Sequence, residues 1–299
     1  MSVRDAIRRR VLRGIALNRT PGLHFPGNFL DISFDRVARD RSSLSLQSGP
    51  WCTDANGEVH LAALALLADF ALAACIRANL RPEQRLATVS FHLQFTGAPA
   101  RGRLKAEGEF RGFLKRGIGC LGMSRVSVSG RSGLVCFGTG TFMALSPPKG
   151  INLHPVRTRR EPARLAERDL SPHEAGILER AEAALGARGN FIENFWGPSA
   201  GVLRNGLHAG NRVGHAQGGI VLAMAAVNAS SVLPRQWRLS SITASYISPG
   251  EGRTLRARSE VIHHGSLTAV VRTGIVGKGG RRVLEVISTH ANGRGDHGR

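Results

Sequence analysis

The chain of 299 residues is poor in cysteine and in aromatic side chains. The cysteines show no CxxC spacing and all lie in the first half of the chain, which excludes a disulfide framework and a zinc site and favours a reducing, cytoplasmic compartment. There is one tyrosine, and aromatic residues make up only 5% of the chain, so the stacking platform of single-strand nucleic-acid binders is not expected. The four cysteines are Cys52, Cys75, Cys120 and Cys136.

Acidic side chains are also scarce, since 21 Asp and Glu stand against 41 Lys and Arg and give a formal charge of +20. Such a charge favours polyanionic partners, namely nucleic acid, an acidic membrane surface or a phosphate-rich small molecule such as coenzyme A. The basic residues are spread over the chain, with their densest run at Arg157–Arg160, and they are equally compatible with a solvated surface. Charge alone therefore does not select a partner.

No apolar run is long enough to cross a membrane. The N-terminus has no continuous apolar segment of the kind that marks a secretory signal, and residues 3–17 predict an amphipathic helix of the fold rather than a transit peptide. The longest apolar stretch, Leu61–Ile76, has sixteen residues and contains an acid, so it is too short and too polar for a membrane span. We therefore expect no membrane partner.

That stretch is nevertheless the centre of the sequence. Apart from Asp69, Leu61–Ile76 contains only Ala, Leu, Phe, Cys and Ile, and a helix that is apolar on all sides is buried. Asp69 then lies in or beside the core, where an unpaired carboxylate is costly. It either caps a backbone group or pairs with an arginine, or it marks a functional site.

Strands on both sides of this helix predict an α+β unit in which an antiparallel sheet packs on one helix. Residues 29–47 alternate in polarity and predict two strands with a polar turn near residues 39–41. Alternation is strongest over Thr88–Phe95. Three more strand-like segments follow, at residues 103–112, 119–129 and 133–144.

The second half repeats this order with a period of about 157 residues. Ser171, Pro172 and Glu174 predict a capped helix start. Gly214 corresponds to Gly57 and precedes a second apolar helix, IVLAMAAVNASSVL. An alternating strand begins at residue 238, and three more are expected at residues 254–263, 267–276 and 282–290.

The repeat predicts two domains of the same kind in one chain. The first is residues 1–146, a basic, Pro-containing linker covers 147–170, the second domain is residues 171–293, and a short tail covers 294–299. The adjacent His263 and His264 have no third ligand in a matching pattern, so they are read as strand-end residues and no metal site is predicted.

The order of elements, with an H-x8-D motif at His60 and Asp69, resembles the hot-dog fold and most of all the phenylacetyl-CoA thioesterase type of acyl-CoA thioesterase. That family has an Asn six residues before an HGG, an Asp nine residues after the His, and a Ser or Thr opening the next strand. The resemblance covers both halves. In the first, His60, Asp69 and Thr88 match, whereas Asp54 replaces the Asn and Leu61-Ala62 replace the glycines.

In the second half the matches are complementary. Asn211 is present, Gly218 and Gly219 follow Gln217, which replaces the His, and Ala226 replaces the acid. The position of the Ser or Thr is ambiguous among Leu239, Ser240 and Ser241. Because the family builds its site across a dimer interface, the resemblance implies an internal pseudo-dimer with one nearly complete composite site.

In that composite site the resemblance implies thioester hydrolysis. Asp69 would activate water or attack directly, the Gly218 N–H would bind the oxyanion, and Thr88 would position the nucleophile. Asn211 and Gln217 would orient the carbonyl or the water. Gly219 and His60 are expected to contribute to substrate binding, although Gly219 is equally suited to helix packing, Asn211 to a turn and His60 to a structural role.

The predicted function is an acyl-CoA thioesterase that needs no cofactor, with coenzyme A as part of the substrate. The alternatives are a catalytically inactive acyl-CoA binding or regulatory protein, a hot-dog dehydratase or hydratase, and a nucleic-acid binder that rests on charge alone. Nucleic acid is not the expected partner. Further association of the pseudo-dimer is compatible with the sequence, and small side chains on the two apolar helices would leave room for an acyl group.

Overall fold

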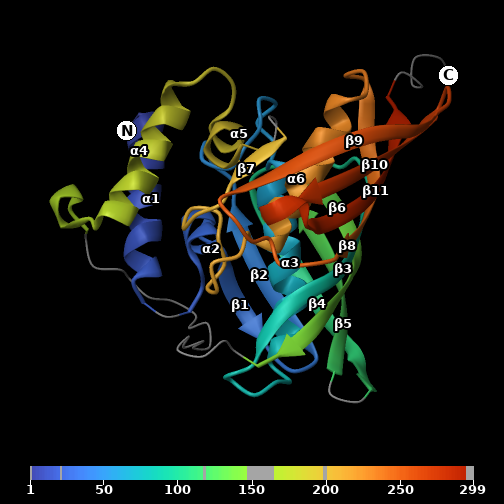
Figure 1. Ribbon diagram of the computed structural model, residues 1–299, viewed down its shortest axis with the longest axis horizontal. Coiled ribbons are helices and arrows are strands. Elements are labelled where there is room, and N and C mark those ends of the chain that lie inside the picture. Colours follow the sequence, from blue (N-terminus) through green and yellow to red (C-terminus); the bar gives the residue numbers. More distant parts are fainter. Residues whose placement is uncertain (1, 21, 117–118, 147–164, 198–200, 294–299) are drawn as a thin grey trace.

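One continuous antiparallel sheet of eleven strands forms the frame of the protein (Figure 1). The computed structural model describes residues 2–20, 22–116, 119–146, 165–197 and 201–293. In the sheet the strands follow the order β1-β2-β4-β5-β6-β3-β8-β11-β10-β9-β7. The first six come from the N-terminal half and the last five from the C-terminal half, so the sheet is itself divided into two halves.

The N-terminal half contributes three helices and six strands. The apolar segment forms α3, which begins after His60 and is buried along nearly its whole length. The strands of this half pack around it, as an apolar helix requires. The elements are α1 (Val3–Asn18), α2 (Phe25–Leu30), β1 (Ser33–Val37), β2 (Arg41–Gln47), α3 (Leu61–Arg77), β3 (Arg85–Phe95), β4 (Arg103–Arg116), β5 (Gly119–Gly130) and β6 (Gly133–Leu145).

The C-terminal half has the same plan around α6, against which β8, β9, β10 and β11 pack. The predicted cap at Ser171 is confirmed, because its hydroxyl accepts from the Glu174 N–H and the Glu174 carboxylate accepts from the Ser171 N–H. The elements are η1 (Glu167–Asp169), α4 (Pro172–Gly186), α5 (Phe191–Trp196), β7 (Val202–Arg204), α6 (Gly218–Ser231), β8 (Trp237–Tyr246), β9 (Thr254–His264), β10 (Thr268–Val276), η3 (Lys278–Gly280) and β11 (Arg282–Asn292).

The two halves meet along β3 and β8, which pair antiparallel from Ser90–Ser245 to Gln94–Ser241. Behind this seam α3 and α6 pack directly against each other. A Cβ on Gly219 would lie 2.9 Å from the backbone nitrogen of Leu66, so the close approach of the two helices requires glycine at this position. Pairing of the halves thereby brings the middle of α3 beside the first turn of α6.

One sequence expectation is corrected. Strand structure does not extend to residue 29, because residues 25–30 form α2, whose Phe25 and Phe29 rings contact Phe195 of α5. Of the linker expected at 147–170, residues 147–164 lie outside the described part, and Leu165 and Leu170 pack on the core. No helix of the described residues is long and apolar enough to cross a membrane.

Candidate active site

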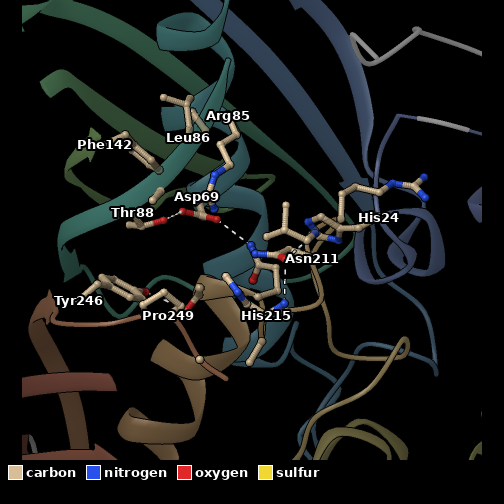
Figure 2. Close-up of a pocket in the computed structure, with 18 of the residues that line it drawn as sticks. His24, Asp69, Arg85, Leu86, Thr88, Phe142, Asn211, His215, Tyr246 and Pro249 are labelled. Atoms are coloured by element: carbon tan, nitrogen blue, oxygen red, sulfur yellow. Dashed lines mark hydrogen bonds between the residues drawn. The ribbon is translucent and has the colours of Figure 1, made fainter. Parts of the chain in front are cut away.

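Asp69 lies in the middle of α3 with only 6% of its surface exposed, and both of its carboxylate oxygens accept hydrogen bonds. The Thr88 hydroxyl donates to Oδ1 at 3.3 Å, and the Gln217 amide donates from Nε2 to Oδ2 at 2.7 Å (Figure 2). Burial raises the pKa of Asp69 to about 6, although the two hydrogen bonds favour the ionised form and oppose the shift. Asp69 is therefore a buried carboxylate that titrates near neutral pH.

Gln217 reaches Asp69 because it is the N-cap of α6. Its Oε1 accepts from the Ile220 N–H at 3.1 Å, and its own backbone N–H donates to the Ala209 carbonyl at 2.9 Å. With the amide oxygen held by the helix, the amide nitrogen points to the carboxylate. The cap thus fixes the orientation of the one side chain that joins α6 to Asp69.

Gly218, the first residue of α6, stands beside both Thr88 and the chain's single tyrosine. A Cβ on Gly218 would lie 3.3 Å from Thr88 Oγ1 and 3.4 Å from Tyr246 Cε1. The Tyr246 hydroxyl donates to the Gly218 carbonyl at 2.8 Å. The Gly218 N–H has no acceptor among the described residues, as is usual in the first turn of a helix, where free N–H groups and the helix dipole favour negative charge.

Thr88 owes its position to an irregularity in β3. The pairing of β3 with β6 shifts register between Thr88 and Ser90, which is the signature of a β-bulge. Bulges re-aim side chains and are frequent beside active sites. In the other half, Ser240 donates to the Thr289 carbonyl at 3.0 Å and is not among the residues that line the cavity.

Asn211 lines the same cavity, but its side-chain oxygen accepts hydrogen bonds from the backbone of its own loop. Oδ1 accepts from the N–H groups of Val213 at 3.0 Å and His215 at 3.1 Å. Asp54 makes the same turn in the first half, where its Oδ1 accepts from Asn56 and Glu58. The turn explains why the two positions correspond, and it leaves the Asn211 Nδ2 as the group available to a ligand.

His60 and Gly219 are not brought into the cavity. His60 is the N-cap of α3: its Nδ1 accepts from the Ala62 N–H at 3.1 Å, and its Nε2 lies 3.5 Å from Glu193 Oε1 of α5. Gly219 faces the backbone of α3 instead. Both residues therefore make structural contacts outside the cavity, and their expected contribution to substrate binding stays a prediction.

The cavity has a volume of about 440 Å³ and takes its walls from both halves. Among the described residues that line it, three are arginines and Asp69 is the only acid. Arg77 donates to the Gln84 and Pro82 carbonyls, and Arg212 donates to the carbonyls of residues 18, 20, 22 and 23. Arg85 is the third. A cavity with this charge suits a ligand that carries negative charge.

Sequence reasoning missed three groups that line the cavity, namely His24, His215 and Tyr246. Only Tyr246 had a signal in the sequence, because it is the single tyrosine among 299 residues. Among the described residues, no group of three or more His, Cys, Asp or Glu side chains could hold a metal ion. Around Asp69 itself, the chemistry available is that of its carboxylate, the Gln217 amide, the Thr88 hydroxyl and the N-terminus of α6.

Comparison with protein families matches one part of the chain. Residues 208–291 match the family model of the acyl-CoA thioesterase N-terminal domain. This match covers the second half from the Asn211 turn to the last strand. No curated protein matches the sequence closely enough to be reported.

Solved structures extend the fold to most of the chain. The "oleoyl thioesterase (putative)" of Lactobacillus plantarum is 10% identical, with a TM-score of 0.53 over 84% of this chain and 96% of its own. A "putative thioesterase" of Novosphingobium aromaticivorans is 16% identical, with a TM-score of 0.50 over 87% of this chain and 98% of its own. The chain therefore has the hot-dog fold of these thioesterases, and residues 208–291 are similar to the acyl-CoA thioesterase N-terminal domain.

Proposed function

We propose that the protein hydrolyses an acyl-CoA thioester to the free acid and CoA at one composite site between its two halves. The observation that carries the proposal is the contact between Asp69 of α3 and Gln217 at the start of α6, 2.7 Å apart. This contact brings the acid of one half to the helix N-terminus of the other.

In the proposed reaction the thioester carbonyl lies between Asp69 and the Gly218 N–H. Asp69 takes a proton from water, whose oxygen attacks the carbonyl carbon, or its carboxylate attacks directly and the resulting anhydride is then hydrolysed. The negative charge that develops on the carbonyl oxygen is stabilised by the Gly218 N–H; a donor of this kind is worth roughly 10²–10³ in rate. The C–S bond then breaks and the CoA thiolate takes up a proton.

Burial suits Asp69 to this task. A desolvated carboxylate with a pKa near 6 is a stronger base than one in water and is still largely ionised at neutral pH. Thr88 and Gln217 hold its two oxygens in place. The three arginines of the cavity wall supply positive charge that favours the CoA phosphates.

The test is thiol release from a panel of acyl-CoAs by the parent, Asp69→Asn and Gln217→Ala. We expect Asp69→Asn to lower kcat by a hundredfold or more, because it removes the base while keeping the side-chain shape. Asp54→Asn is the matched control: it keeps the Oδ1 acceptor of the corresponding turn in the other half, and its rate should equal that of the parent.

If the parent binds acyl-CoA but releases thiol from no member of the panel, the protein is instead an acyl-CoA binding protein. Equal rates for the parent and Asp69→Asn would remove Asp69 from the reaction. In either case the composite site would not be the hydrolytic centre proposed here.

A further inference from the structure

His24 is a cavity-lining side chain that the proposed hydrolysis does not use. It lies in the segment between α1 and α2, and its ring meets Phe70 edge to face with centroids 5.1 Å apart. Phe70 in turn stacks on Phe34 of β1 at 6.2 Å. We name the wall formed by Leu23, His24, Phe34, Phe70 and Ala73 the aromatic arm of the cavity; His24 is its one polar side chain.

Both ring nitrogens of His24 lack a partner among the described residues. Nδ1 is shut off from solvent and makes no hydrogen bond. Nε2 also makes no hydrogen bond but is not among the shut-off atoms, so it is the nitrogen that reaches open space in the cavity. Although His24 is the N-cap of α2, its side chain makes no cap bond. The ring packs on Phe70, but the described residues give neither of its nitrogens a hydrogen-bond partner.

The imidazole is neutral. Burial, reinforced by the positive charge of Arg212, lowers the pKa of His24 to about 3. A neutral imidazole carries one ring proton. On Nδ1 that proton would face no acceptor, whereas on Nε2 it faces the cavity. The arm thus presents one N–H donor to the cavity in otherwise apolar surroundings, where an oxygen of a ligand can accept its hydrogen bond.

We propose that His24 determines specificity by donating a hydrogen bond to an oxygen on the acyl group, so that the substrate class is an acyl-CoA with a hydroxyl or oxo substituent. This inference rests on the proposed function, because it places the acyl group in the aromatic arm. Figure 2 shows His24 on the side of Asn211, away from Thr88 and Phe142. An acyl group that extends from Asp69 along Phe70 passes His24.

The test measures binding to CoA thioethers, which cannot be hydrolysed. Two thioethers share one carbon chain, and one of them carries a hydroxyl whose position is scanned along the chain. By calorimetry the parent should bind the hydroxylated compound about tenfold more tightly at one position, which is the value of one hydrogen bond to an otherwise unpaired group. A parent without preference at any position would overturn the inference.

Three variants show whether the preference belongs to His24. His24→Leu removes the donor and should abolish the preference. His24→Gln places an amide near the position of Nε2 and should keep it, whereas His24→Asn reaches only the position of Nδ1 and should lose it. His208→Leu is the matched control, because His208 is another buried histidine with an unpartnered ring nitrogen but does not line the cavity.

The outcomes separate this inference from the proposed function. A preference that persists in both His24→Leu and His24→Asn, or that is lost in His208→Leu, overturns the role of His24. Thiol release by a parent without hydroxyl preference overturns the inference and leaves the hydrolase intact. Binding with the expected preference but without thiol release overturns the proposed hydrolysis and leaves the role of His24 intact. A parent that binds neither thioether and releases no thiol overturns both.

Discussion

At the scale of single residues, the environment of Asp69 couples its chemistry to the stability of the fold. The folded protein keeps this carboxyl protonated up to about pH 6, whereas an aspartate in the unfolded chain releases its proton near 3.8. Between these values the native state binds the extra proton, so this group makes the protein less stable as the pH rises through the window. At pH 7 the ionised, buried carboxylate costs about 3 kcal/mol.

Asp69→Asn should therefore be more stable relative to the parent at pH 7 than at pH 4, by about 2–3 kcal/mol. Urea unfolding of both proteins across this range measures the difference. Desolvation lowers the pKa values of His24, His208 and His290 to about 3 or 4, but these histidines titrate in both proteins and their contributions cancel. A difference in stability that stays constant with pH would show that folding does not raise the pKa of Asp69.

Tyr246 is a positioning residue rather than a reacting one. Its hydroxyl donates to the Gly218 carbonyl and so holds the first turn of α6 against β8. Tyr246→Phe should lower kcat about tenfold with little change in KM, because in the proposed reaction the Gly218 N–H stabilises the charge that develops in the transition state. An unchanged kcat would leave the tyrosine with a packing role only.

A spectroscopic control for Tyr246 is available because it is the only tyrosine. Burial, with a further contribution from Asp69, raises its pKa well above 10. An alkaline titration followed in the ultraviolet should show a single tyrosine that ionises above its ordinary range in the folded protein. The signal should be missing from Tyr246→Phe.

At the scale of elements, the contact between α3 and α6 decides whether the composite site forms. Gly219→Ala would place a methyl group 2.9–3.0 Å from the α3 backbone at residues 65 and 66, and backbone cannot move aside as a flexible side chain can. We expect a loss of about 1–3 kcal/mol in the free energy of unfolding. A fall in hydrolysis should accompany it, because Gln217 moves with α6.

Gly176→Ala is the control for this prediction. Gly176 lies within α4, and a Cβ there would have no atom within 4 Å. Alanine should therefore stabilise the protein by about 0.5–1 kcal/mol through its helix propensity. Thermal unfolding of both variants is the measurement, and equal shifts in the two would show that the helix contact is not tight.

The elements also show what the sequence could predict. Long segments with one strong pattern, such as α3, α6 and β3, were predicted correctly, because the apolar residues of each segment alone indicate which of its faces are buried. The correspondence of Asp54 with Asn211 is confirmed by two identical turns. α2 and α5 were missed, because each has only six residues and is stabilised by contacts between aromatic rings far apart in sequence.

The same reason limits what could be predicted of the site. Asp69, Thr88, Gln217 and Gly218 meet as the repeat implied. The contact of His60 with Glu193 depends on α5, and the position of His24 depends on the path between α1 and α2. The short helices α2 (FPGNFL) and α5 (FIENFW) do correspond, since each follows the first long helix of its half, but their offset of 166 residues departs from the period of about 157 that aligned the two halves.

At the scale of the whole molecule, the N-terminal and C-terminal halves are held together beyond the shared sheet. α1 packs beside α4 (Figure 1), and Arg19 pairs with the Glu174 carboxylate at 2.7 Å, a bond that lowers the pKa of Glu174 to about 2. Arg212 of the second half binds four carbonyls of the α1–α2 segment. The segment that carries His24 is therefore fixed by the half that carries Gly218.

The differences between the two halves predict one ligand site per chain. At the position related by the repeat, Ala226 stands in place of the acid, Leu61 in place of Gly218, and His60 meets Glu193 of α5. Calorimetric titration with a CoA thioether should therefore give one bound molecule per chain. Asp69→Asn should retain that stoichiometry, because it keeps the shape of the site.

Restoring the acid alone should not create a second site. Ala226 is fully buried, so Ala226→Asp places a carboxylate in the core, and the stoichiometry should remain one. The free energy of unfolding should fall by several kcal/mol, because the new carboxylate would be buried in an apolar environment. The double variant Ala226→Asp/Glu193→Gln also removes the carboxylate of α5. It should still bind one ligand per chain, because the side chain of Leu61 occupies the space that a glycine would leave free. A titration that reaches two in either variant would mean that the second half-site is open, and that the single site reflects the missing acid alone.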